Sequence, residues 1–193
     1  MNRNEKIKKY DDMLQKCIDK KEYVKIFRII FDTEENLSGF ILKMSKDFLL
    51  LQLDYEFMFD GYVIIRKDDF DSLRCNAYDK TQKKIFKAEG LLETGYGIKE
   101  NINLTSWVTI LNDLRRYDFH AIIENTHKDY LDFFIGPIKR VTKTTVNIHN
   151  YDPTGKLYDK LSSIKLESIK HIKFGDKYST TFRKYLKQPE SIK

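Results

Sequence analysis

The stretch SGFILKMSKDFLLLQLDY (38–55) decides the fold, because the chain repeats its pattern later as IGPIKRVTKTTVNIHNYD (135–152). The two stretches align without a gap, so that Gly39 falls on Gly136 and Lys46 falls on Lys143. Apolar residues also meet apolar residues: Ile41 with Ile138, Met44 with Val141, Leu49 with Val146, and Leu51 with Ile148. Such similarity at a spacing of about one hundred residues predicts two copies of one structural unit.

The pattern around these stretches predicts that each copy is a helix followed by about five short strands. Residues 5–21 place apolar side chains on one face of a charged helix, and short apolar runs follow it. In the second copy, Thr105 or Ser106 can cap a helix that contains Trp107. The later segment IRKDDFDSL (65–73) aligns with IKLESIKHI (164–172), which extends the repeat to the last strands.

Three glycines between residues 90 and 97 indicate a flexible connection between the copies. We therefore expect a first domain at residues 1–88, a linker at 89–104, and a second domain at 105–193 that ends in a basic segment. In that segment, Tyr178, Phe182 and Tyr185 have helical spacing, which predicts a helix that packs through these rings.

Gly39 and Gly136 predict the shape of each unit. A glycine that recurs early in the second strand is needed where the strand kinks or where another backbone comes close. The expected fold class is mainly β with α: two tandem small, bent, five-stranded antiparallel barrels, each preceded by a helix.

At the level of pattern, the chain resembles the Sm-like family, whose fold is a helix followed by a bent, five-stranded SH3-like barrel. The resemblance covers residues 5–86 and 105–186, and it is strongest at 65–73, which is similar to the family's second signature. Lys67 stands where the family has glycine, and Ser45 and Leu49 stand at the family's acidic and asparagine positions. The resemblance implies RNA binding and assembly into rings through edge strands.

No motif predicts an enzyme. The four histidines (His120, His127, His149 and His171) have no metal-binding spacing, and Cys17 and Cys75 form no CxxC pair. The glycines near residue 90 lack the spacing of a dinucleotide-binding loop. We expect no catalytic residue, no metal site and no cofactor.

The composition predicts a folded protein, since 41% of the residues are hydrophobic and 13% are aromatic. No run approaches the roughly 18 apolar residues that span a bilayer, so no membrane association is expected. The charged N-terminus lacks the apolar core of a secretory signal, and the two isolated cysteines fit a reducing compartment. These features favour a cytoplasmic location.

A formal net charge of +6, from 35 Lys and Arg against 29 Asp and Glu, is modest and fits an ordinary solvated surface, but the basic residues could also bind phosphates by releasing counterions. Together with the family resemblance, it predicts a non-enzymatic module that binds single-stranded RNA on barrel loops. The expected phosphate contacts are Arg66, Lys67 and Lys165, assisted by Lys46 and Lys143, with Phe48 stacking on a base. Basic residues also gather in two other places. The first helix carries Lys6, Lys8, Lys9, Lys16, Lys20 and Lys21, and the C-terminal segment carries Lys165, Lys170, Lys173, Lys177, Arg183, Lys184 and Lys187.

The alternative is a protein-interaction or self-assembly scaffold with no nucleic-acid ligand, in which barrel edge strands pair with other chains. The two hypotheses differ in salt dependence, because phosphate contacts release counterions and strand pairing does not.

Overall fold

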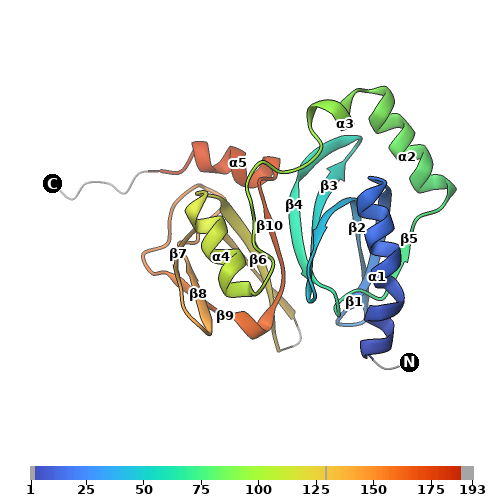
Figure 1. The fold of residues 1–193 in the computed structure, drawn as a ribbon. Coiled ribbons are helices and arrows are strands. Elements are labelled where there is room, and N and C mark those ends of the chain that lie inside the picture. The colour runs from blue at the N-terminus through green and yellow to red at the C-terminus, as the bar shows by residue number, and fades with distance from the viewer. Residues whose placement is uncertain (1–2, 129, 188–193) are drawn as a thin grey trace. The chain divides into compact units, whose positions relative to one another are not determined.

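The computed structural model describes residues 3–128 and 130–187, and the chain divides into two compact units, Met1–Lys99 and Glu100–Lys193. Both units are built mainly from antiparallel strands, with helices before and after them (Figure 1). The expected mainly β character, with a helix before each group of strands, is confirmed.

Unit 1 begins with a helix and forms an antiparallel sheet in the order β5-β1-β2-β3-β4. Two further helices follow the sheet in the sequence. The elements are α1 (Arg3–Asp19), β1 (Tyr23–Ile30), β2 (Thr33–Met44), β3 (Phe48–Tyr55), β4 (Met58–Arg66), β5 (Ser72–Arg74), α2 (Ala77–Ala88) and α3 (Leu91–Thr94).

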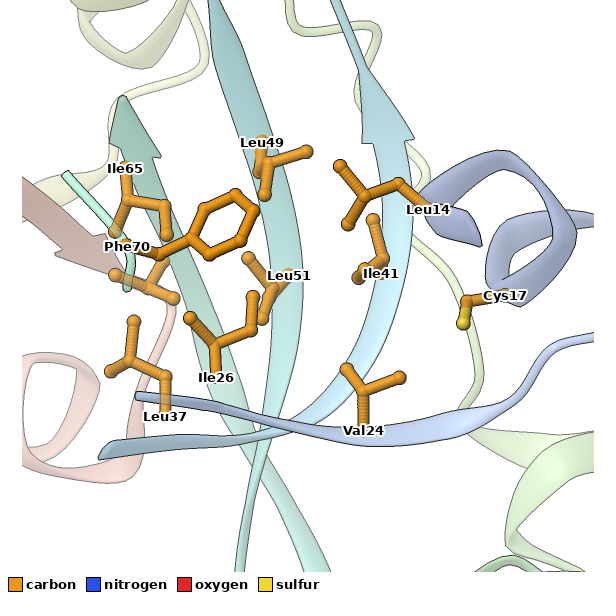
Figure 2. Close-up of a cluster of buried hydrophobic side chains, with 11 residues drawn as sticks. Leu14, Cys17, Val24, Ile26, Leu37, Ile41, Leu49, Leu51, Ile65 and Phe70 are labelled. Atoms are coloured by element: carbon orange, nitrogen blue, oxygen red, sulfur yellow. The ribbon is translucent and has the colours of Figure 1, made fainter. Parts of the chain in front are cut away.

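The main core of unit 1 lies between α1 and one face of the sheet. Leu14 of α1 points toward Ile41 of β2 (Figure 2), and both side chains are fully buried. Each of the strands β1 to β4 contributes to the same cluster, because alternate strand residues face one side. Phe70, which follows β4, closes this cluster.

The opposite face of the sheet is covered by α2 and α3, which the sequence analysis did not predict. Phe86 of α2 packs with Tyr23 and Phe40, and the neighbouring rings of Phe59 and Tyr96 extend this aromatic cluster. Aromatic side chains bury large areas, so the cluster anchors the two helices firmly.

The glycine-rich segment after α2 is not a free linker. The buried side-chain amide of Gln52 donates to the carbonyl of Gly95 at 2.8 Å and accepts from the N–H of Gly97 at 2.8 Å. The Tyr62 hydroxyl also donates to the carbonyl of Gly97. These bonds attach residues 91–97 to unit 1, which corrects the expectation of a flexible connection there.

Unit 2 repeats this arrangement. Its sheet has the order β10-β6-β7-β8-β9, and a helix again follows the last strand. The elements are α4 (Trp107–Arg116), β6 (His120–His127), β7 (Tyr130–Val141), β8 (Thr145–Ile148), β9 (Ser162–Lys165), η1 (Leu166–Ser168), β10 (Ile169–Phe174) and α5 (Lys177–Lys184). Phe182 of α5 packs on Tyr151, as its helical spacing predicts.

The strand registers bear out the predicted alignment of the two copies. Opposed residues in each of three strand pairings of unit 1 have aligned counterparts in unit 2. Tyr23 opposes Phe40 as His120 opposes Pro137, Leu49 opposes Ile65 as Val146 opposes Ile164, and Ile26 opposes Leu73 as Ile123 opposes Ile172. A β-bulge also recurs at matching places in β2 and β7.

Gly39 and Gly136 occupy the same backbone position, with φ angles of 148° and 154°. A Cβ atom on Gly39 would lie 2.0 Å from the carbonyl oxygen of Gln52, and one on Gly136 would lie 2.2 Å from that of His149. Only glycine allows the two strands to approach this closely. The predicted role of these glycines is confirmed.

Closure of the sheets into barrels is not shown. In the part of the chain that the structure describes, no pairing joins β4 to β5 or β9 to β10, so each strand order is open within its unit.

Candidate nucleic-acid interface

In unit 1, the turn between β2 and β3 lies beside the end of β4. The Ser45 hydroxyl accepts hydrogen bonds from two backbone N–H groups of the turn, at 3.2 and 3.0 Å, which fixes the turn. The backbone N–H of Lys67 donates to the carbonyl of Asp47 at 2.8 Å. The structure therefore brings Lys46, at the tip of the turn, to the same end of the sheet as Arg66 and Lys67.

The two predicted phosphate contacts at this end of unit 1 are already occupied within the protein. Arg66 donates through Nε and Nη2 to the two carboxylate oxygens of Asp68, both at 3.0 Å. The Lys67 side chain is only 3% exposed, and its ammonium group forms an ion pair with Asp11 and donates to the carbonyl of Ser45. Lys67 therefore attaches α1 to the sheet, which corrects its expected role at the surface.

Phe48 does not offer a stacking platform. It is the first residue of β3 and is 4% exposed, so its ring lies in the interior rather than at the surface. A base needs access to an open ring face, and the expected stacking role is corrected accordingly.

Unit 2 builds the same loop geometry. The Thr142 hydroxyl accepts from two backbone N–H groups of the β7–β8 turn, at 3.2 and 2.9 Å, as Ser45 does in unit 1. The backbone N–H of Leu166 donates to the carbonyl of Thr144 at 2.9 Å. Lys143 and Lys165 are both exposed at this end of the sheet, which we call the unit 2 loop end.

The charges of the unit 2 loop end are weakly compensated. The Lys165 ammonium lies 4.0 Å from the Glu167 carboxylate, and both side chains are about three-quarters exposed or more. Exposed pairs of this kind contribute little and are screened by salt. The two units also differ in overall charge, because residues 1–99 carry 19 Lys and Arg against 18 Asp and Glu, whereas residues 100–193 carry 16 against 11.

Unit 2 also contains a pocket of about 370 Å³ that the sequence analysis did not predict. It lies between the strands β6 and β7, the loop after β8, and the end of α5, and we call it the α5 pocket. Its lining residues are Asp118, His120, Pro137, Lys139, His149, Leu157, Arg183, Lys184, Leu186 and Lys187. The C-terminal basic group was recognised in the sequence, but its convergence with Lys139 and two histidines depends on how α5 packs.

The two histidines of the α5 pocket are held differently. His120 is 8% exposed, and burial, together with the nearby charges of Arg183 and Lys139, lowers its pKa to about 4 against the opposing effect of Asp118. His149 lies 2.8 Å through Nε2 from the carbonyl oxygen of Tyr158. Because a carbonyl only accepts, Nε2 carries the proton in that bond.

Within 3–128 and 130–187, no group of three or more His, Cys, Asp or Glu side chains is arranged to hold a metal ion. Within these ranges, no helix combines the length and apolar character needed to cross a membrane.

The fold and the site define a mainly β protein with a repeated unit and a basic second half. No family model, curated protein or solved structure matches the chain.

Proposed function

We propose that this chain is a non-enzymatic binding module that holds single-stranded RNA on the unit 2 loop end. Lys143 and Lys165 make the phosphate contacts, and each unit is a bent, Sm-like barrel. The observation that carries the proposal is the presence of two exposed lysines at one end of a sheet, where the exposed Glu167 lies 4.0 Å from Lys165 as a weak counter-charge. Support also comes from the order of elements in each unit, a helix and then five antiparallel strands, and from the basic excess of unit 2.

The comparison between the units supports unit 2 as the binding half. At the equivalent end of unit 1, Arg66 is bound by Asp68 and Lys67 is buried against Asp11. A ligand phosphate would have to compete with these carboxylates, whereas at the unit 2 loop end it meets Lys143 and Lys165 directly. Phosphate contacts draw most of their free energy from counterion release, so uncompensated surface lysines are the favourable partners.

The test measures binding of a short fluorescein-labelled oligouridylate by fluorescence anisotropy over a range of salt concentrations. We expect the double variant Lys143→Ala, Lys165→Ala to bind more weakly and to lower the salt slope by about 1.4, since each lost contact on a single strand removes about 0.7. The matched control, Lys46→Ala with Arg66→Ala, removes the equivalent cations of unit 1 and should leave the slope unchanged. Equal slopes for the wild type and the unit 2 variant would contradict the proposal.

A second candidate function is a protein-interaction scaffold without a nucleic-acid ligand. It is favoured by the β3–β4 turn, where the large apolar side chains of Tyr55, Phe57 and Met58 are about half exposed or more. Exposed apolar groups that lie together mark interaction surfaces. Light scattering at several protein and salt concentrations tests this candidate: an assembly that persists in high salt and is lost in Phe57→Ser supports it, and a monomer throughout contradicts it.

A further inference from the structure

We propose that the α5 pocket binds a phosphomonoester group, which in the RNA complex is the terminal phosphate of the strand. The assignment of this phosphate to an RNA strand rests on the proposed function. The preference of the pocket for a phosphomonoester group does not depend on that function. The site is separate from the unit 2 loop end, since neither Lys143 nor Lys165 lines the pocket.

The walls of the pocket are fixed by contacts within unit 2. Arg183 of α5 donates to the backbone carbonyl of Asp118 and pairs with its carboxylate. Beyond the helix, the backbone N–H of Lys187 donates to the carbonyl of Gly155 at 3.0 Å. Gly155 has a φ angle of 79°, and a Cβ atom there would lie 2.9 Å from the carbonyl oxygen of Tyr185. These contacts attach the backbone of the C-terminal segment at Lys187 to the loop at Gly155.

The charge of the lining suits a dianion. The lining contains four cationic side chains and one carboxylate, that of Asp118, which forms an ion pair with Arg183. The cationic residues are Lys139, Arg183, Lys184 and Lys187. In the described residues, no salt bridge joins the three lysines to an acid, although hydrogen bonds from Thr154 and the charge of Lys187 help to lower the pKa of Asp152. A phosphomonoester carries about −1.5 to −2 at pH 7 and offers three acceptor oxygens, whereas an internal phosphodiester carries a single charge. The pocket therefore favours a terminal phosphate over an internal one.

His120 adds a neutral hydrogen-bonding group to the pocket. The residue is more than nine-tenths buried, and its Nδ1 atom has no hydrogen-bond partner among the residues that the structure describes. Buried polar atoms are nearly always paired, so an unpaired ring nitrogen in the wall of a basic pocket indicates a group that a ligand completes. The volume of about 370 Å³ exceeds that of phosphate alone and lies in the range of small-molecule sites, which leaves room for an attached nucleoside.

Isothermal titration calorimetry with uridine 5′-monophosphate and with uridine tests the phosphomonoester preference in the full chain. We expect the monophosphate to bind and uridine not to bind. The double variant Lys139→Ala, Lys184→Ala should weaken monophosphate binding at least about tenfold, because it removes two charge-assisted contacts. The control Lys84→Ala, Lys87→Ala, which changes exposed lysines of α2 outside the pocket, should leave it unchanged. Failure of the monophosphate to bind, or equal affinity in the pocket variant, would overturn the inference.

A second pair of probes identifies the source of the phosphate. An oligouridylate with a 5′-phosphate should bind more tightly than the same strand with a 5′-hydroxyl, and this difference should vanish in the Lys139→Ala, Lys184→Ala variant. If the monophosphate binds while both strands bind equally or not at all, the ligand is a free nucleotide. That result rejects an RNA strand as the bearer of the phosphate and supports the pocket as a phosphomonoester site. If the strands bind and the monophosphate does not, the pocket inference fails while the proposed function survives.

Discussion

Replacing Gly39 with alanine is expected to destabilise unit 1 strongly, and the structure allows the size of the effect to be estimated. The new Cβ atom would lie 2.0 Å from the carbonyl oxygen of Gln52, so the strands β2 and β3 must separate by more than about 1 Å to restore ordinary contact. The φ angle of 148° adds backbone strain of about 1–3 kcal/mol. Losing about two ladder hydrogen bonds adds about 1 kcal/mol each, giving a total of about 3–5 kcal/mol.

The matched control is Gly90→Ala. Gly90 also has a positive φ angle, of 70°, but a Cβ atom there would meet nothing within 4 Å. This variant carries only the cost of the left-handed backbone, about 1–2 kcal/mol. The difference between the two variants therefore isolates the close approach of β2 and β3.

The assay is urea unfolding followed by circular dichroism, with hydrogen exchange of the β2 and β3 amides as a local readout. With a slope of about 1–3 kcal/mol per molar urea, a difference of about 2 kcal/mol separates the two midpoints by about 1 M. Gly136→Ala should produce the same loss in unit 2, detected by the fluorescence of the buried Trp107. Equal stability of Gly39→Ala and Gly90→Ala would refute the packing argument.

Two further predictions concern buried polar groups. Lys67→Leu should leave the free energy of unfolding almost unchanged, whereas Asp11→Ala should lower it by about 3 kcal/mol, because the Lys67 ammonium then stays buried without its counter-charge. Urea unfolding of both variants measures the two changes. Equal losses of stability in the two variants would contradict the prediction. For His120, burial lowers the folded pKa to about 4, below the ordinary 6.5, so the unfolded chain binds the proton first as the pH falls. The contribution of neutral His120 to folding stability is therefore full above pH 6.5 and is lost as the pH falls toward 4. Between these pH values His120→Asn should lose less stability than the wild type, as measured by unfolding followed through Trp107 fluorescence. Identical pH profiles of stability for the two proteins would argue against this role of His120.

The repeat could be predicted from the sequence because it depends on backbone geometry that few residues satisfy. Gly39 and Gly136 mark the close strand crossing, and the buried positions Ile65 and Ile164 keep the register on either side of it. A shift of one residue in the pairing of two strands would turn every apolar side chain of a strand to the other face of the sheet. A matching apolar pattern therefore fixes how the two copies align.

The helix α2 was missed because most of its surface is polar. Its buried residues are Phe86 and Asp79, which is too few for a clear apolar stripe. A signal was nevertheless present, since Asn76 and Asp79 form a capping box, and Arg74 donates to the Asp79 carboxylate through Nε and Nη2. An N-cap residue such as asparagine, followed by an acidic residue three positions later, is a signal for the start of a helix.

Part of the candidate site could not be predicted because it depends on packing between distant segments. The alignment predicts that Lys46 and Lys143 occupy equivalent loop positions. It does not predict that α1 buries Lys67, since this depends on which face of the helix meets the sheet. The α5 pocket joins residues from His120 to Lys187, and only the docking of α5 brings them together.

Comparison of the two units separates the residues that build the fold from those available to a ligand. Leu166 of unit 2 takes the place of Lys67, because its backbone N–H makes the equivalent bond to the preceding turn and its side chain is also buried. Because an apolar side chain fills this buried position in unit 2, the position serves packing, and the charge of Lys67 is not required there to contact a ligand. The neighbouring position differs in the opposite sense, since Arg66 is held by Asp68 while Lys165 is exposed. If one unit binds an anion at its loop end, these partners predict that it is unit 2, and loss of binding in Arg66→Ala alone would contradict that assignment.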